Sequence, residues 1–148
     1  MSLLALPLFA AVTAASGPPA TPPPEVGGIG VAPPPAWVEV GRRSVWATYG
    51  SYCWTVPGKS AACVDMIPPS TRPDIARVST VPESTVRLHL RFAPRSVRVY
   101  RLVGTKRIRV PATAARTVAW SARPGVFDVE VTGAGGSASY VVRLVPPG

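Results

Sequence analysis

The stretch Val86-Arg87-Leu88-His89-Leu90-Arg91-Phe92 decides the fold class of this 148-residue chain. Its apolar and polar residues alternate with a period of two, which is typical of a β-strand with one buried face. No segment carries an extended apolar stripe with the 3.6-residue period of a helix. Nineteen prolines and 13 glycines also disfavour long helices. We therefore expect an all-β domain.

The same alternation recurs on both sides of this stretch. Val97, Val99 and Val103 lie on one side of a run that leads through Gly104-Thr105 into residues 108–110, and residues 127–131 lead through a Gly-rich turn into 138–144. Both pairs predict β-hairpins, and further strands are expected between residues 37 and 54 and at residues 116–120. Seven to eight short strands predict a two-layer antiparallel sandwich, with a small barrel as the alternative.

The N-terminus has the pattern of an export signal. Residues 3–12 form an uncharged apolar run that is too short to span a bilayer, and small residues follow that suit cleavage after Ala14, Ala15 or Ser16. We therefore expect residues 1–16 to be a signal peptide, with no transmembrane span left after its cleavage. Eight prolines follow between residues 17 and 35. They predict a semi-rigid, Pro-rich linker, so the folded domain is expected to cover residues 36–148.

The two cysteines, Cys53 and Cys63, are expected to form a disulfide because the chain is expected to be exported. A zinc site is disfavoured, because the chain has one histidine and cannot supply four ligands of this kind. A reactive thiol is disfavoured because no base accompanies either cysteine.

Aromatic residues surround this cysteine pair, and Asp65 follows it. The candidate ligand platform consists of Trp46, Tyr49, Tyr52, Trp54 and Asp65. Exposed rings could stack on the faces of sugars, while the carboxylate could accept hydrogen bonds from their hydroxyls. We favour the alternative that the rings pack in the core, as aromatic residues do in β-sandwiches. A third hypothesis is a small protease inhibitor that presents the loop between the cysteines, with Lys59 at its tip.

The chain is strongly basic. Sixteen Lys and Arg residues face seven Asp and Glu residues, for a net charge of +9, and no acidic residue lies between Glu83 and Asp128. Strand alternation puts the candidate anion-binding residues on a solvent face: Arg87, Arg91, Arg98, Arg107 and Arg109. An anionic envelope polymer or lipid headgroups would suit such a face, although general surface charge is the interpretation that we favour. Specific nucleic-acid binding is not expected, because no recognised motif is present.

Catalysis is not expected either. The sequence has no nucleophile elbow, phosphate-binding loop or zinc-protease motif, and it indicates no cofactor. Asp128 and Glu130 lie two residues apart and therefore on one face of a strand, as a hydrolase pair would. We interpret them as the solvent face of an edge strand, where charge discourages aggregation.

The segment Gly50-Ser51-Tyr52-Cys53-Trp54, followed by Cys63-Val64-Asp65, resembles a group of small bacterial proteins of unknown function. These proteins are exported or lipid-anchored and carry a Gly-x-Tyr-Cys-Trp and then a Cys-Val-Asp pattern. The similarity extends to Pro124-Gly125-Val126-Phe127 and to residues 136–140. It implies an immunoglobulin-like sandwich without catalytic residues, although this chain lacks the Cys of the lipid-anchored members. We therefore expect an exported, non-catalytic protein of the cell envelope with a structural or binding role.

Overall fold

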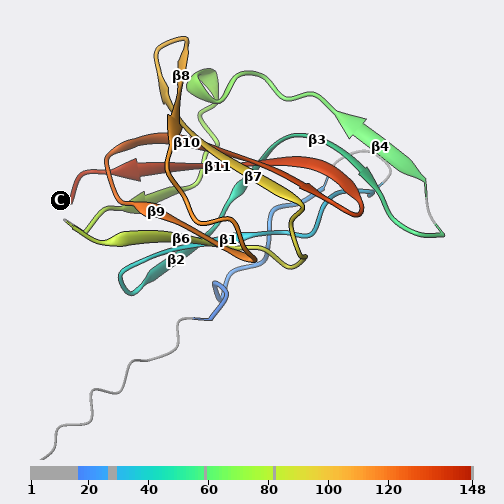
Figure 1. The fold of residues 1–148 in the computed structure, drawn as a ribbon, viewed down its shortest axis with the longest axis horizontal. Helices are drawn as coiled ribbons and strands as arrows, with labels where there is room; N and C mark the ends of the chain where they lie inside the picture. The colour runs from blue at the N-terminus through green and yellow to red at the C-terminus, as the bar shows by residue number, and fades with distance from the viewer. Residues whose placement is uncertain (1–16, 27–29, 59, 82, 148) are drawn as a thin grey trace, which may run out of the picture.

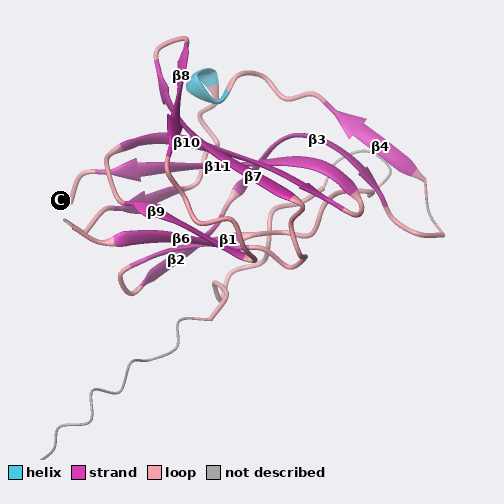
Figure 2. Ribbon diagram, viewed as in Figure 1, coloured by secondary structure: helices cyan, strands magenta, loops and turns pink. Residues whose placement is uncertain are grey.

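The computed structural model of the protein describes residues 17–26, 30–58, 60–81 and 83–147. This part of the chain contains eleven strands and one 3-10 helix, η1 (Pro69–Thr71). Figure 2 shows that strands and loops account for nearly all of it. The all-β prediction is therefore confirmed. The expected signal peptide and Lys59 lie outside the described residues.

The smaller sheet has four antiparallel strands in the order β2-β1-β6-β9. They are β1 (Trp37–Val40), β2 (Arg43–Trp46), β6 (Thr85–His89) and β9 (Thr117–Ser121). The alternating residues Val86 to His89 belong to β6, which lies between β1 and β9. Val38 of β1 pairs with Leu88 of β6, and both side chains are buried.

The larger sheet has seven strands, in the order β4-β3-β11-β10-β7-β8, and β5 pairs with β11 in parallel. Its strands are β3 (Thr48–Thr55), β4 (Ala61–Val64), β5 (Arg77–Ser79), β7 (Ser96–Val103), β8 (Lys106–Val110), β10 (Gly125–Gly133) and β11 (Gly136–Val145). The two predicted hairpins are present as β7–β8 and β10–β11.

The two sheets form the layers of a sandwich (Figure 1). Its core is built from alternate residues of both sheets, such as Val86 and Leu88 from β6 and Val129 and Val131 from β10. The antiparallel two-layer prediction is thus confirmed apart from the parallel β5. The described residues contain eleven strands rather than the expected seven to eight, because strands such as β4, with four residues, and β5, with three, are too short to show the alternation. Immunoglobulin-like topology stays a prediction.

The hairpin β7–β8 extends beyond the two layers (Figure 1). Sequence alternation placed Ile108 and Val110 of β8 on a buried side, and this is wrong for Ile108, which is 49% exposed. The other residues of β8 from Lys106 to Arg109 are exposed as well. The alternation of β8 therefore marks a strand, but no second layer lies opposite it.

The Pro-rich segment is not a free linker, because part of it packs on the domain and the packed region extends N-terminally of the predicted boundary at residue 36. Val31 and Pro33 are buried, and Val26 and Ala32 pack against the core. Three aromatic side chains also hold its backbone. Trp46 Nε1 donates to the carbonyl oxygen of Thr21 at 2.7 Å, Tyr49 donates to that of Pro33 at 2.7 Å, and Tyr140 donates to that of Pro34 at 2.6 Å. Proline carbonyls accept hydrogen bonds even though proline donates none.

Candidate functional site

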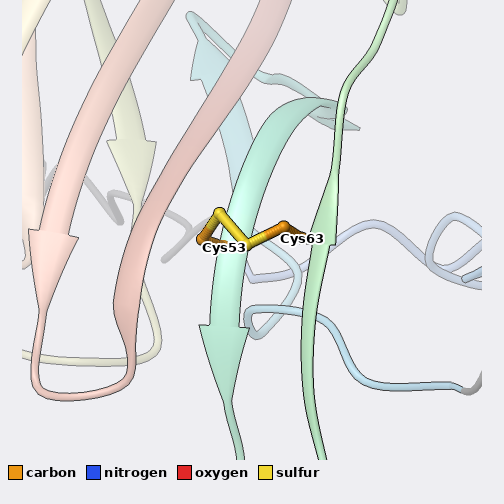
Figure 3. Close-up of a disulfide and its surroundings, with 2 residues drawn as sticks. All are labelled: Cys53 and Cys63. Carbon is orange, nitrogen blue, oxygen red and sulfur yellow. A yellow bond between two sulfur atoms is a disulfide. The ribbon is translucent and has the colours of Figure 1, made fainter.

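The disulfide between Cys53 and Cys63 is present (Figure 3). It joins directly paired residues of β3 and β4, whose Cα atoms are 4.0 Å apart. Both residues are exposed. The bond therefore fastens an edge strand to the larger sheet and does not link the two layers of the sandwich.

The aromatic residues around this disulfide do not form an exposed platform. Trp46, Tyr49, Tyr52 and Trp54 are each at most 9% exposed. The last three belong to the core cluster, and Trp54 contacts Phe92 with a ring-centroid distance of 5.1 Å. Asp65 is exposed, but no open ring lies beside it in this set. The stacking faces that a sugar would need are thus occupied by the protein itself.

The candidate arginines do not share one face. Arg87 lies on β6 of the smaller sheet and Arg91 lies two residues beyond the end of that strand, whereas β7 and β8 of the larger sheet carry the other three. Arg91 is positioned over the Trp46 ring, 5.4 Å from its centroid. The predicted single basic face is therefore corrected to two separate groups of cations.

Arg107 also has the acidic partners that its local sequence lacks. Its Nη2 lies 2.6 Å from Glu130 Oε1 and 3.4 Å from Asp128 Oδ2. Both carboxylates come from β10, which pairs with β7. A sheet brings distant segments side by side, so charge balance along the sequence did not predict charge balance in space.

The projecting end of the β7–β8 hairpin carries a group of exposed cations. We call Val103, Lys106, Arg107, Ile108 and Arg109 the cationic hairpin; all five are exposed. Arg107 and Arg109 flank the Tyr100 ring, at 4.1 and 5.9 Å from its centroid. Such cation–π contacts hold the two guanidinium groups in place at a modest energetic gain. Within the described residues, no carboxylate lies within ion-pair distance of Lys106 or Arg109.

A groove of about 520 Å³ crosses the outer face of the larger sheet. Small residues of β3 and β11, namely Gly50, Ser51, Ser137 and Ser139, line it, together with charged residues of β10, β7 and β8. The connection that contains η1 contributes Met66, Ile67 and Pro69. We call this the outer-face groove. Its size is within the range of small-molecule sites.

Glycine is required at one point of the floor of the outer-face groove, which β3 and β11 form. A Cβ at Gly50 would lie 2.5 Å from the Ser139 side-chain oxygen, which is closer than real Cβ atoms approach. Gly50 therefore lies directly against Ser139. The floor of the groove is low at this point because neither residue has a large side chain.

Asp128 is the most enclosed charged residue of the groove, with 9% of its surface exposed. Burial raises the pKa of its carboxyl, while a hydrogen bond donated by Ser139 and the charge of Arg107 oppose that rise. Asp128 and Glu130 do share a face, as predicted. The edge-strand interpretation is wrong, however, because β10 lies between β11 and β7. The two carboxylates therefore lie in the interior of a sheet face and in a groove.

The solitary histidine has a packing role. The His89 ring stacks on Trp37 with centroids 3.8 Å apart and planes 14° apart, and its Nε2 lies 3.4 Å from Glu39 Oε2. Sequence alternation placed His89 on the exposed side among arginines. The His89 ring is half-buried rather than exposed, because Trp37 of β1 is its direct partner in the sheet.

Sequence reasoning did not find the outer-face groove. Its lining residues lie as far apart in the chain as Gly50 and Ser139, and the pairing of strands brings them together. A usable signal was the run of small polar residues on the outer side of β11, at Ser137 and Ser139. Small side chains on a sheet face leave room between larger neighbours.

Among the described residues, no three His, Cys, Asp or Glu side chains are grouped so that they could hold a metal ion. That part of the chain also has no helix of the length and apolarity needed to cross a membrane. Comparisons with protein-family models, with curated proteins and with solved structures find no match to this chain.

Proposed function

We propose that this chain is an exported, non-catalytic binding protein of the bacterial cell envelope, and that it binds an anionic polymer there through the cationic hairpin. The observation that carries the proposal is the exposure of Lys106 and Arg109 on a hairpin that extends beyond the sandwich (Figure 1). An extended polymer can reach such a hairpin without a cleft.

The charge of the chain supports this ligand class. A net charge of +9 attracts polyanions at long range, and a projecting feature concentrates that attraction where it is least shielded by the protein. Guanidinium groups are planar and bind phosphate or carboxylate groups through two parallel hydrogen bonds. Tyr100 holds the guanidinium groups of Arg107 and Arg109 in place, which reduces the entropy lost on binding.

Two observations support the location. The Cys53–Cys63 disulfide is of a kind that forms and persists in oxidising compartments outside the cytoplasm. The N-terminal sequence has the apolar core and small residues typical of an export signal.

The test uses inorganic polyphosphate as the probe and compares two double variants. Lys106→Glu with Arg109→Glu reverses two charges on the hairpin. Arg116→Glu with Arg123→Glu makes the same change in net charge at exposed positions elsewhere. Binding is measured by fluorescence anisotropy at several salt concentrations.

The hairpin variant should bind at least about tenfold more weakly at low salt, equivalent to about 1.4 kcal/mol, and the control variant should change far less. Affinity of the wild type should fall with added salt, because the contacts are screened. An equal loss in both variants would mean that only net charge matters, as for a general surface charge. Binding to phosphatidylglycerol vesicles without binding to polyphosphate would instead indicate a membrane surface as the target.

A further inference from the structure

We propose that the outer-face groove is a second binding site, and that its ligand is an uncharged, hydroxyl-rich saccharide. The groove meets the cationic hairpin at Arg107, whose guanidinium is paired with Asp128 and Glu130, but Lys106 and Arg109, the cations that a polyanion would contact, do not line it. Three features of the groove indicate this ligand: its shape, its charge balance and the pairing of its donors and acceptors.

The shape follows from side-chain size. The floor over β3 and β11 is made of Gly50, Ser51, Ser137 and Ser139, while the long side chains of Arg98 and Arg107 lie on the β7–β8 side. The connection that contains η1 adds an apolar part, in which Ile67 is 60% exposed. A ligand would thus meet hydroxyl groups, charged groups and hydrocarbon in one groove.

The charges of the groove cancel within it. Arg107 lies between Asp128 and Glu130 and forms ion pairs with both, and Arg98 adds a second guanidinium. Two cations thus balance two anions. A groove without excess charge gives no electrostatic preference for an ionic ligand, unlike the cationic hairpin. It therefore suits a ligand that is polar but neutral.

Donors and acceptors are placed side by side. Arg98 of β7 is the direct partner of Glu130 in β10, so the two side chains leave the same face of the sheet as neighbours. Arg98 is exposed, and the Glu130 side chain is 41% exposed with one oxygen engaged by Arg107. Two adjacent hydroxyls of a sugar can meet such a pair, because one accepts from the guanidinium while the other donates to the carboxylate.

The hydroxyls of the floor extend this pattern. Ser139 donates to Asp128, which leaves its oxygen able to accept. Ser51 accepts from the backbone of Met66 at 2.9 Å, which leaves its hydroxyl hydrogen able to donate. The C–H face of a sugar ring would lie against Met66 and Ile67, which would remove exposed apolar surface from water. Together these groups offer what a neutral sugar requires.

The test is a titration of the full-length, ¹⁵N-labelled protein with three uncharged probes: maltotriose, cellotriose and mannotriose. At about 10 mM, a site with a Kd of about 1 mM would be nearly saturated. We expect at least one of the three to shift the amide signals of Ser137 and Ser139 saturably. Glu130→Gln should weaken that binding by about tenfold, and Ser137→Trp should abolish it by filling the groove at an exposed position.

The control variants separate this site from the proposed function. Lys106→Glu with Arg109→Glu should lose polyphosphate binding and keep the sugar shifts. Failure of all three sugars to shift the groove signals would overturn the inference while leaving the polyphosphate result intact. Saturable shifts with glycylglycine and not with sugars would also overturn it and would assign the groove to a zwitterion.

Discussion

Removing the hydroxyl groups that hold the Pro-rich segment should destabilise the whole domain. Tyr49 and Tyr140 lie in the core, and their hydroxyls donate to the carbonyl oxygens of Pro33 and Pro34. Substitution of either tyrosine by phenylalanine keeps the ring and its packing. It removes one donor and leaves a proline carbonyl without its partner.

The two losses should differ in size. An unsatisfied buried polar group costs about 1–3 kcal/mol, whereas a group that water can reach costs less. The hydrogen bond to Pro33 is buried and the one to Pro34 is partly buried. We therefore expect Tyr49→Phe to lower the free energy of unfolding by about 2 kcal/mol and Tyr140→Phe by about 1 kcal/mol. The two rings lie 5.9 Å apart, so the double variant need not show the sum.

Urea unfolding at neutral pH measures these differences, and limited proteolysis reports whether residues 17–35 become accessible. Tyr100→Phe is the matched control, because its hydroxyl makes no hydrogen bond to another described side chain or carbonyl and its ring is only half-buried. The control should change the free energy of unfolding by less than about 0.5 kcal/mol.

A pH series provides a second readout. Burial raises the pKa of Tyr49 from 10.0 to about 12. The folded state therefore keeps this proton longer than the unfolded state, so stability is lost as pH rises from 10 toward 12. Tyr49→Phe should lack that part of the alkaline loss. If both Phe variants unfold at the wild-type urea midpoint and residues 17–35 stay protected, the two hydrogen bonds do not hold the Pro-rich segment on the domain.

Three further predictions concern the disulfide and two carboxylates of opposite behaviour. Replacing Cys53 and Cys63 by Ser should lower the free energy of unfolding by about 2.7 kcal/mol, because the disulfide closes a loop with a sequence separation of 10. Thermal unfolding measures this loss, with the neighbouring Thr55→Ala as the control. A loss no larger than that of the control would mean that the cross-link contributes little. Because burial raises the pKa of Asp128, its contribution to stability falls as pH rises above 3.8, so Asp128→Asn should gain stability relative to wild type at neutral pH and lose that advantage in acid. The hydrogen bond from Arg72 lowers the pKa of Asp74, so Asp74→Asn should be less stable than wild type above pH 3.8, and a gap of the same sign for both variants in urea titrations would contradict this assignment.

The strands were predictable where one face of a strand is fully buried. The alternation around Leu88 identified β6, because each inward residue contacts the opposite sheet. Alternation in β8 gave the right element and the wrong environment, since Ile108 faces no second layer. Periodicity reports how a segment is built, whereas burial depends on what lies opposite it.

The aromatic and charged residues show the same limit. The residue types of Trp46 and Tyr49 fitted either a core or an exposed platform, and only their packing decided between the two. Arg107 had no acidic neighbour in sequence, yet Glu130 lies 2.6 Å from it. Strand order, which a single sequence does not contain, brought β10 beside β7.

By itself the sequence determined the all-β class and the cysteine pair, because both depend on local spacing and on counting residues. It also determined the excess of positive charge. The tertiary structure alone decided that the Pro-rich segment packs on the domain, that the arginines divide between two sheets and that a neutral groove crosses the outer face of the larger one. These features depend on pairing between strands far apart in the chain, and the free energy of that pairing comes from the whole core rather than from any one segment.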